Sequence, residues 1–297
     1  MTRMFRNAIR LLLLSCPTYR GGIHIAQSKL CSKLTSHDEY LVTPLWNGGH
    51  VKVNVNDYDG RSLFFWGSND RKITWLCCRL LRTGDTMLDI GANFGAVGIA
   101  AARRVGQRGQ VHCFEPQPLL AECIRFSADL NRLGNLSVHQ AALSNRDGTR
   151  HFVIPPGHTG RGSLELSAHE GCTITVPLHH AATYLKKIGC PAARVIKLDV
   201  ESHEEAVLQG ATSYLNDQKP LAVIFESHDH GQPFFERGPV NILRELGYSF
   251  FQIRQSALFR VQLKAIVNAQ AVETGYDFLA CDTSRVKAEV RPICSIV

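Results

Sequence analysis

Three absences narrow the possibilities for this 297-residue chain. None of its ten cysteines forms a C-x-x-C pair, which argues against zinc-ribbon and thioredoxin-like sites. No apolar run approaches the roughly 20 residues that a membrane-spanning helix requires. Residues 1–36 contain no acidic residue, and their six basic residues account for almost all of the net charge of +7. Because the rest of the chain is nearly neutral, we expect no nucleic-acid partner.

The first residues predict a basic amphipathic helix. Its two faces, one apolar and one basic, consist of Met4, Phe5, Ala8, Ile9 and Leu12, and of Arg3, Arg6 and Arg10. Such a helix can target a protein to an organelle, contact a membrane surface through residues 1–16, or be a solvated extension. We expect a cytoplasmic protein, with organelle targeting or peripheral membrane contact as the alternatives.

The pattern divides the chain into three parts: a basic extension (1–36), a leading segment (37–84) and a main domain (85–297). In the leading segment, residues 50–55 and 62–66 predict short strands, and residues 71–81 predict a helix. In the main domain, the strands predicted from apolar runs are 86–90, 110–116, 135–143, 193–200, 220–227, 248–254 and 275–282. Helical patterns fall between most of them, including 201–211, which we expect to end at Gly210. This alternation is typical of an α/β fold with a parallel sheet.

The middle of the chain interrupts this alternation. Residues 150–155 and 172–178 alternate between apolar and polar side chains, and they flank the turn "GHTGRGS". Alternation with a period of two is typical of a half-buried antiparallel strand. We therefore predict a β-hairpin insertion.

The stretch "MLDIGANFG" predicts a nucleotide-binding corner, because a strand passes through a glycine-containing turn into a helix. Gly91 and Gly95 permit backbone angles or close ligand approach that a side chain would block. The spacing does not match G-x-G-x-x-G, so a nicotinamide-dependent oxidoreductase is a weak alternative. Asp89 would repel a pyrophosphate but suits a ligand with a positive amine, such as S-adenosylmethionine.

Two later positions are consistent with a nucleoside. Glu115 follows the loop by about 20 residues, where a carboxylate can accept both ribose hydroxyls of an adenosine. The small residues around Ala142, after the third predicted strand, would let main-chain groups approach an adenine. Together with the first turn, they predict a nucleoside cofactor.

At these positions, and in the second half of the chain, the sequence resembles the FkbM family of S-adenosylmethionine-dependent methyltransferases. The motifs are "LDIGANFG", "FEPQP", "LNRLGNLSVHQAAL" and "VIKLDVESHEEAVLQGA", within Leu41 to Asp282. The resemblance implies a Rossmann-like, doubly wound, mostly parallel seven-stranded sheet. It also implies methyl transfer from S-adenosylmethionine, usually to a hydroxyl oxygen of a sugar or natural product.

Carried over, the resemblance implies several site residues. The methionine side of the cofactor would meet Asp89, Gly91, Ala92, Asn93 and Gly95, the ribose Glu115, and the adenine Ala142. The charged positions of the last motif are Lys197, Asp199, Glu201 and Glu204. The chain departs from the family at Ser202, where the family has glycine, and at Ala181-Ala182, where the family has an acidic residue.

Methyl transfer to a hydroxyl needs a base and a well-aligned acceptor. Asp199 and Glu201 would share a face if their strand is regular, so they are the first candidates. Glu226 and His228, after the next strand, are the second candidates. Lys197 either serves the reaction or forms a structural ion pair with Asp199.

Two alternatives accompany this reading. A metal at His228-Asp229-His230 is less favoured than a polar loop, so we predict no metal. The expected partner is a small-molecule or carbohydrate hydroxyl acceptor, and a non-catalytic nucleoside-binding module on the same fold remains the alternative.

Overall fold

The structure, a computed structural model, describes residues 2–16, 21–228, 231–255, 261–269, 272–273, 275–282, 285 and 295–296. Asp229 and His230, which belong to the metal alternative, lie outside the described residues.

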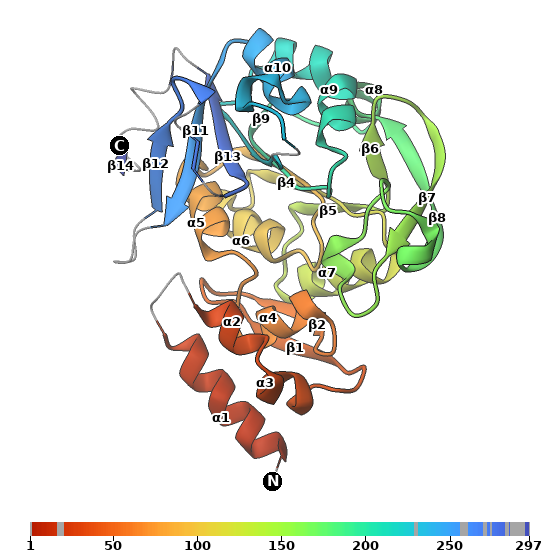
Figure 1. Cartoon of the computed structure of the whole chain (residues 1–297), viewed down its shortest axis with the longest axis vertical. Coiled ribbons are helices and arrows are strands. Elements are labelled where there is room, and N and C mark those ends of the chain that lie inside the picture. Colours follow the sequence, from red (N-terminus) through yellow and green to blue (C-terminus); the bar gives the residue numbers. More distant parts are fainter. Residues whose placement is uncertain are drawn as a thin grey trace.

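A large sheet forms the centre of the molecule (Figure 1). In spatial order its strands are β14 (Ser295–Ile296), β12 (Val261–Ala265), β11 (Tyr248–Gln255), β13 (Asp277–Asp282), β10 (Ala222–Glu226), β9 (Ala193–Leu198), β3 (Thr86–Ile90), β4 (Gln110–Phe114) and β5 (Leu136–His139). Strands β10, β9, β3, β4 and β5 run parallel, whereas β13 is antiparallel to both of its neighbours. The Rossmann-like fold is confirmed. The number seven is corrected to nine within the described residues, because β12 and β14 extend the edge beyond β11.

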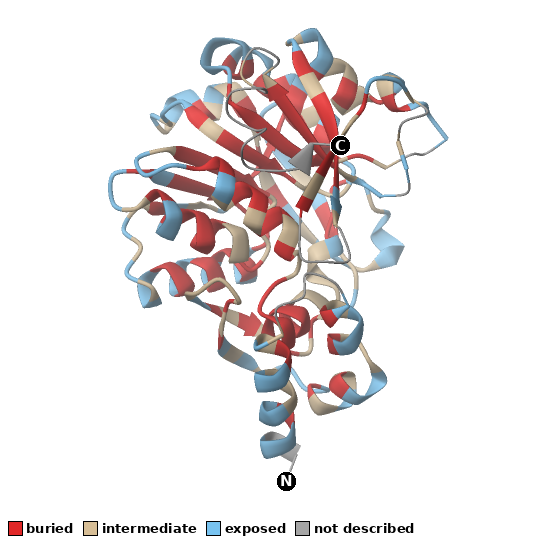
Figure 2. Ribbon diagram, turned by 90° about the vertical axis from the view of Figure 1, so that its left-hand side faces the viewer, coloured by how far each residue is buried: buried red, intermediate tan, exposed pale blue. Residues whose placement is uncertain are grey.

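Helices cover both faces of the sheet, because successive strand residues point to opposite sides. Met87 lies in one buried cluster and Leu88 in the other. The Met87 side is covered by α5 (Arg71–Leu80), α6 (Ala96–Val105) and α7 (Pro118–Leu130). The Leu88 side is covered by α8 (Ala181–Lys187), α9 (Glu204–Gln218) and α10 (Gly238–Glu245), and η3 (Phe234–Glu236) precedes α10. Figure 2 shows the buried strands between these layers.

The sequence predicts that helix α9 ends at Gly210, and this is wrong. The helix continues to Gln218. Gly210 is needed for packing: a Cβ there would lie 2.0 Å from the carbonyl oxygen of Ser144. The glycine thus allows α9 to lie against a neighbouring strand and does not end the helix.

The predicted hairpin is confirmed as part of a second sheet. Strands β7 (Gly148–Ile154) and β8 (Cys172–His180) pair antiparallel, and β6 (Ala142–Ser144) adds in parallel to β8. Two short turns of 3₁₀ helix, η1 (Thr159–Arg161) and η2 (Ala168–Glu170), lie in the hairpin loop. The strand predicted over 135–143 is thus divided: β5 joins the large sheet, and the chain then turns to form β6 in the small one.

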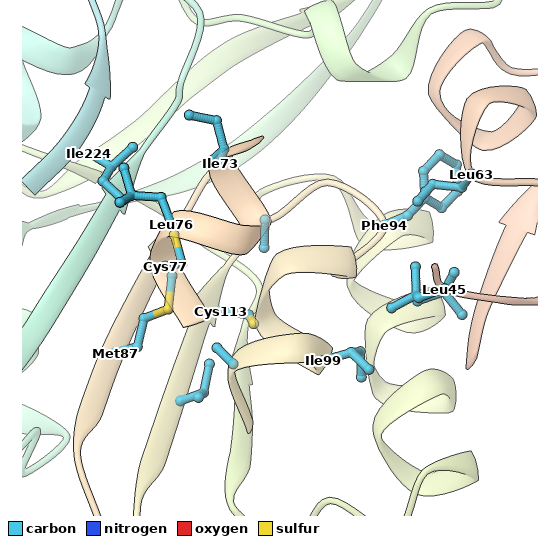
Figure 3. Close-up of a cluster of buried hydrophobic side chains, with 14 of the residues drawn as sticks. Leu45, Leu63, Ile73, Leu76, Cys77, Met87, Phe94, Ile99, Cys113 and Ile224 are labelled. Atoms are coloured by element: carbon cyan, nitrogen blue, oxygen red, sulfur yellow. The ribbon is translucent and has the colours of Figure 1, made fainter. Parts of the chain in front are cut away.

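The leading part of the chain packs on the α5–α7 side. It comprises α1 (Thr2–Leu14), α2 (Gly22–Ala26), α3 (Lys29–Leu34), β1 (Tyr40–Pro44), β2 (His50–Asn54) and α4 (Tyr58–Trp66). Figure 3 shows Leu63 of α4 close to Phe94 of the first turn, and Ile99 of α6 facing Leu45. The leading segment and the sheet therefore share one hydrophobic core.

The strand predicted over 62–66 was wrong, because these residues form the second half of α4. All five are buried, so their apolar run carries no periodicity that could separate a helix from a strand. The decisive signal is Asp57, whose side chain accepts hydrogen bonds from the backbone amides of Asp59 and Gly60 and so starts the helix.

Candidate functional site

The first turn joins β3 to α6 with three residues in the left-handed region. The φ angles are 79° at Gly91, 51° at Asn93 and 80° at Gly95. A Cβ at Gly91 would lie 1.7 Å from the carbonyl oxygen of Asp199, so glycine is needed for the close approach of the turn to the end of β9. Gly95 is the N-cap residue of α6 and packs against Ile124.

Glu115, just beyond β4, connects the first turn to the second. Its Oε2 accepts a hydrogen bond from the Asn93 amide at 2.9 Å, and its Oε1 accepts one from the Gln117 amide at 3.0 Å. Burial raises the pKa of Glu115 to about 7, although the two amide hydrogen bonds oppose the rise. Two fixed hydrogen bonds hold the carboxylate in one orientation at the carboxyl end of the sheet, where ligands bind in this class of fold.

A cavity of about 590 Å³ opens above these turns. Its walls come from the ends of β3 and β4, the start of β6, the hairpin loop and the turn after β9. Six residues predicted from the sequence line it: Gly91, Asn93, Glu115, Ala142, Asp199 and Glu201. The structure thus brings four of the seven predicted cofactor residues and the first catalytic candidates to one space, whereas Asp89, Ala92 and Gly95 do not line it.

Asp89 lies beneath the first turn, fully buried and outside the walls of the cavity. Lys197 Nζ is 3.6 Å from Asp89 Oδ1 and 3.1 Å from Asp199 Oδ2, and it donates a 2.7 Å hydrogen bond to the Gly91 carbonyl. Burial raises the pKa of Asp89, and the Lys197 charge opposes the rise. Asp89 therefore influences the first turn indirectly: it attracts Lys197, and Lys197 hydrogen-bonds to the turn.

Lys197 is held as a cation. Burial by itself would lower its pKa, but the carboxylates of Asp199 and Asp89 outweigh burial and raise it. An ammonium with a raised pKa is a poor base near neutral pH, so Lys197 is a structural brace that binds Asp199 and the first turn together.

Asp199 and Glu201 come together by a route that the sequence did not suggest. Strand β9 ends at Leu198, so strand alternation does not apply to them, and that premise was wrong. The chain instead turns sharply, with φ 52° at Glu201 and 76° at Ser202. Burial, followed by the charge of Asp199, raises the pKa of Glu201 to about 7. A carboxylate with such a pKa is suited to proton transfer near neutral pH.

Glu204 is a capping carboxylate and not a reacting group. Its Oε1 accepts a hydrogen bond from the Val200 amide at 2.9 Å, and the residue is buried.

The hairpin also contacts the turn after β9: Ser163 Oγ donates a hydrogen bond of 2.5 Å to the Glu201 carbonyl. This hydrogen bond and the one that Glu204 accepts hold the backbone at Val200 and Glu201, which suits a turn that must keep one position.

A second cavity, of about 650 Å³, adjoins the first through Asn93 and Asp199. Ala92, Lys197 and Glu226 line it, together with other carboxylates from α5 and β13. Burial and then the charge of Asp199 raise the pKa of Glu226. Glu226, one of the two second candidates predicted from the sequence, thus faces a different space from Glu201.

His228 lies at the margin of the site. Its Nε2 is 3.7 Å from Glu226 Oε2, and its ring centroid is 4.5 Å from that of Tyr276. Among the described residues that line the two cavities, His228 is not included. Those residues also contain no group of three or more His, Cys, Asp or Glu side chains that could hold a metal ion.

Sequence reasoning missed the contribution of the leading segment. Asp57 Oδ2 accepts a 2.7 Å hydrogen bond from the Thr159 amide of the hairpin loop, and the Tyr58 amide donates to the Gly157 carbonyl at 2.8 Å. Burial and the charge of Asp57 raise the pKa of Asp59 to about 7. The start of α4 thus holds the loop that covers the first cavity. The D-Y-D sequence at the start of α4 signals a helix N-cap at Asp57, but not this distant contact.

His203 is a second residue that the sequence did not single out. It lines the first cavity, while its Nδ1 is 2.7 Å from Glu165 Oε1 and its Nε2 is 3.0 Å from Ser144 Oγ. Because both ring nitrogens have partners, we interpret His203 as a link between the hairpin sheet and the turn that carries Glu201.

The pattern of the family described as "Methyltransferase FkbM domain" matches residues 89–260, which is more than half of the chain. This chain belongs to the FkbM methyltransferase family. The matched region begins at Asp89 and includes both turns, the hairpin and the end of β9. The leading segment, which holds the hairpin loop beside the first cavity, lies outside the matched region.

Three solved structures resemble this FkbM-family chain in part. A methyltransferase FkbM from Methylobacillus flagellatus is 14% identical, with 68% of this chain and 45% of that chain covered and a TM-score of 0.41. The O-methyltransferase TomG from Streptomyces achromogenes, in complex with SAM, is 15% identical over 71% and 78%, with a TM-score of 0.40. A precorrin-6y C5,15-methyltransferase from Geobacter metallireducens is 13% identical over 71% and 87%, also at 0.40. No curated protein matches the chain.

Proposed function

We propose that this chain transfers a methyl group from S-adenosylmethionine to a hydroxyl group of a small molecule, sugar or glycoconjugate. One observation supports the proposal above the others. A single cavity joins the fixed carboxylate of Glu115 to the carboxylates of Asp199 and Glu201, and the Gly91 and Asn93 turn lies between them.

The residues fit the cofactor. Glu115 uses one acceptor site on each oxygen for a backbone amide, and a carboxylate has further lone pairs for the two ribose hydroxyls. Asn93 Oδ1 is buried and has no hydrogen-bond partner among the described residues, so it can accept from the cofactor's amine. Ala142 leaves room for the adenine.

The protein's own part in the reaction is to position the acceptor and to take its proton. When bound, the cofactor supplies a methyl group that its sulfonium has already activated. Glu201 then takes the acceptor's hydroxyl proton, because burial beside Asp199 gives it a pKa of about 7. Asp199, whose charge Lys197 balances, orients the acceptor. The hairpin loop, which Asp57 at the start of α4 holds in place, forms part of the wall around the acceptor.

Calorimetry tests cofactor choice. The full chain should bind S-adenosylmethionine, with no heat from NADH. Binding of NADH alone would favour the oxidoreductase alternative and overturn the proposal.

An acceptor screen tests catalysis. With a cofactor labelled in its methyl group, mass spectrometry of a mixture of sugars and phenolic or aliphatic alcohols should show one class that gains the label. Label on amines alone would show that the acceptor group is wrong. Cofactor binding without transfer to any member would favour the non-catalytic module.

A further inference from the structure

Helix α1 packs against the rest of the chain with its basic face. Arg6 is buried, its Nη1 lies 2.7 Å from Glu39 Oε2, and its guanidinium lies 5.3 Å from the Phe64 ring centroid. The Arg10 guanidinium lies 4.9 Å from the same ring. Leu13, the buried apolar residue near the end of the helix, joins the core. Charged side chains therefore dock this helix onto α4 and onto Glu39, the residue before β1.

The opposite face of α1 is apolar and exposed. The exposed fractions are 78% for Met4, 52% for Phe5, 65% for Leu11 and 74% for Leu12, and Ala8 is exposed between them. This spacing places all five on one stripe of a helix about 20 Å long. A surface helix of a globular protein ordinarily has such an apolar stripe facing the core. Figure 2 shows that α1 is largely exposed near the N-terminus.

The neighbouring helices add apolar and basic side chains to the same end of the molecule (Figure 1). Ile25 on α2 and Leu30 on α3 have exposed fractions of 50% and 51%. Lys29 and Lys33 of α3 are also exposed. No acidic residue precedes Asp38 in the sequence. This end of the molecule thus combines an apolar stripe with the exposed positive charges of Lys29 and Lys33.

We propose that the apolar stripe of α1 inserts into the surface of an anionic phospholipid membrane, with Lys29 and Lys33 over the lipid head groups. Apolar side chains beside basic ones are the features that bind a helix in the plane of a membrane interface. None of the described helices is long and apolar enough to cross a bilayer. A second copy of the chain is a poorer occupant, because pairing would bring two segments with the same net positive charge together.

The test is vesicle flotation of the full chain. The protein should float with vesicles that contain phosphatidylcholine and phosphatidylglycerol, and much less with phosphatidylcholine alone. The double variant Leu11→Ser, Leu12→Ser should bind anionic vesicles about tenfold or more weakly, because two apolar anchors are lost. Lys29→Gln should reduce binding about fivefold, and only to the anionic vesicles.

The matched control is Leu119→Ser, Leu130→Ser, which changes two leucines of α7 with exposed fractions of 64% and 45%. This variant should float like the unchanged chain. Failure of the unchanged chain to float with anionic vesicles would overturn the proposal, as would equal flotation of both leucine pairs. Light scattering that shows a dimer, dissociated by the α1 variant but not by the α7 variant, would assign the stripe to a second copy instead.

Discussion

Lys197 Nζ, on β9, donates a hydrogen bond of 2.7 Å to the carbonyl oxygen of Gly91 in the turn after β3. The same ammonium lies within 3.6 Å of Asp89 and within 3.1 Å of Asp199. One buried cation thus joins the turn proposed to hold the cofactor to a residue proposed to orient the acceptor. This link makes both parts of the site dependent on a single side chain.

Replacing that cation should destabilise the protein. Lys197→Met should lower the free energy of unfolding by about 3–5 kcal/mol, because it leaves the fully buried Asp89 without its counter-charge. Urea unfolding followed by circular dichroism measures the loss. Lys186→Met, at an exposed position on α8, is the matched control and should change stability little.

The double variant Lys197→Met, Asp89→Asn separates the ion pair from simple packing. Removal of both charges should restore part of the stability, since no uncompensated carboxylate remains. If the double variant is as unstable as the sum of the two single variants, the pairing has no energetic role.

Glu115 should control cofactor affinity. In Glu115→Gln, one of the two backbone amides at this position meets an NH₂ group in place of an acceptor, and the negative charge is lost. Affinity for S-adenosylmethionine should fall tenfold or more, equivalent to about 1.4 kcal/mol, in calorimetry. Glu122→Gln, on the exposed face of α7, should bind normally. Equal affinity in the two variants would contradict the assignment of the ribose site.

The interaction between Asp199 and Glu201 should appear in the pH dependence of turnover. If Glu201 is the base, its ionised form is active, so kcat/KM should rise with pH and level off above about pH 7. Asp199→Asn removes a negative charge that raises the pKa of Glu201. The rising limb should therefore move to lower pH while the maximum rate falls.

Initial rates with labelled cofactor, from about pH 5 to about pH 9, measure this shift. Asp217→Asn, on the exposed side of α9, should leave the limb in place. A limb that stays at the same pH in Asp199→Asn would contradict the assignment of Glu201 as the base, because the group that takes the proton would then not feel the Asp199 charge.

The sequence was sufficient where local patterns decide structure. All seven strands predicted for the main sheet are present, because buried strands appear as short apolar runs between helical patterns. The turn at Gly91 and the acid at Glu115 could be placed because their spacing follows from a strand, a helix and a second strand. The positions of these two parts of the proposed cofactor site therefore follow largely from local order along the chain.

The sequence was insufficient where contacts between distant segments determine the structure. Asp57 and Thr159 are about 100 residues apart, and only the folded chain shows that one holds the other over the cavity. Gly210 illustrates the same limit, since a mid-helix glycine that allows packing against Ser144 looks like a helix end in the sequence. The position of Asp89 behind the turn also depends on β9, which lies about 100 residues later.

The turn after β9 offers a test in which glycine should stabilise the protein. Ser202 stands where the family has glycine, and its φ of 76° lies in the left-handed region. A residue other than glycine pays about 1–2 kcal/mol for this conformation. Replacing the serine by glycine removes this cost, but about 0.4–1 kcal/mol of the stabilisation is lost again because glycine makes the unfolded chain more flexible. Since the first effect is larger, Ser202→Gly should stabilise the protein by roughly 0.5–1 kcal/mol in thermal unfolding.

A second serine provides the comparison for this prediction. Ser167 has a φ of −80°, and its side chain caps η2. Ser167→Gly should therefore destabilise the protein, because the cap is lost and no backbone strain is relieved. Opposite signs for the two serine-to-glycine changes would show that backbone strain is stored beside Glu201. If both changes destabilise the protein to the same extent, Ser202 is under no strain, and the turn is held as easily by serine as by the family's glycine.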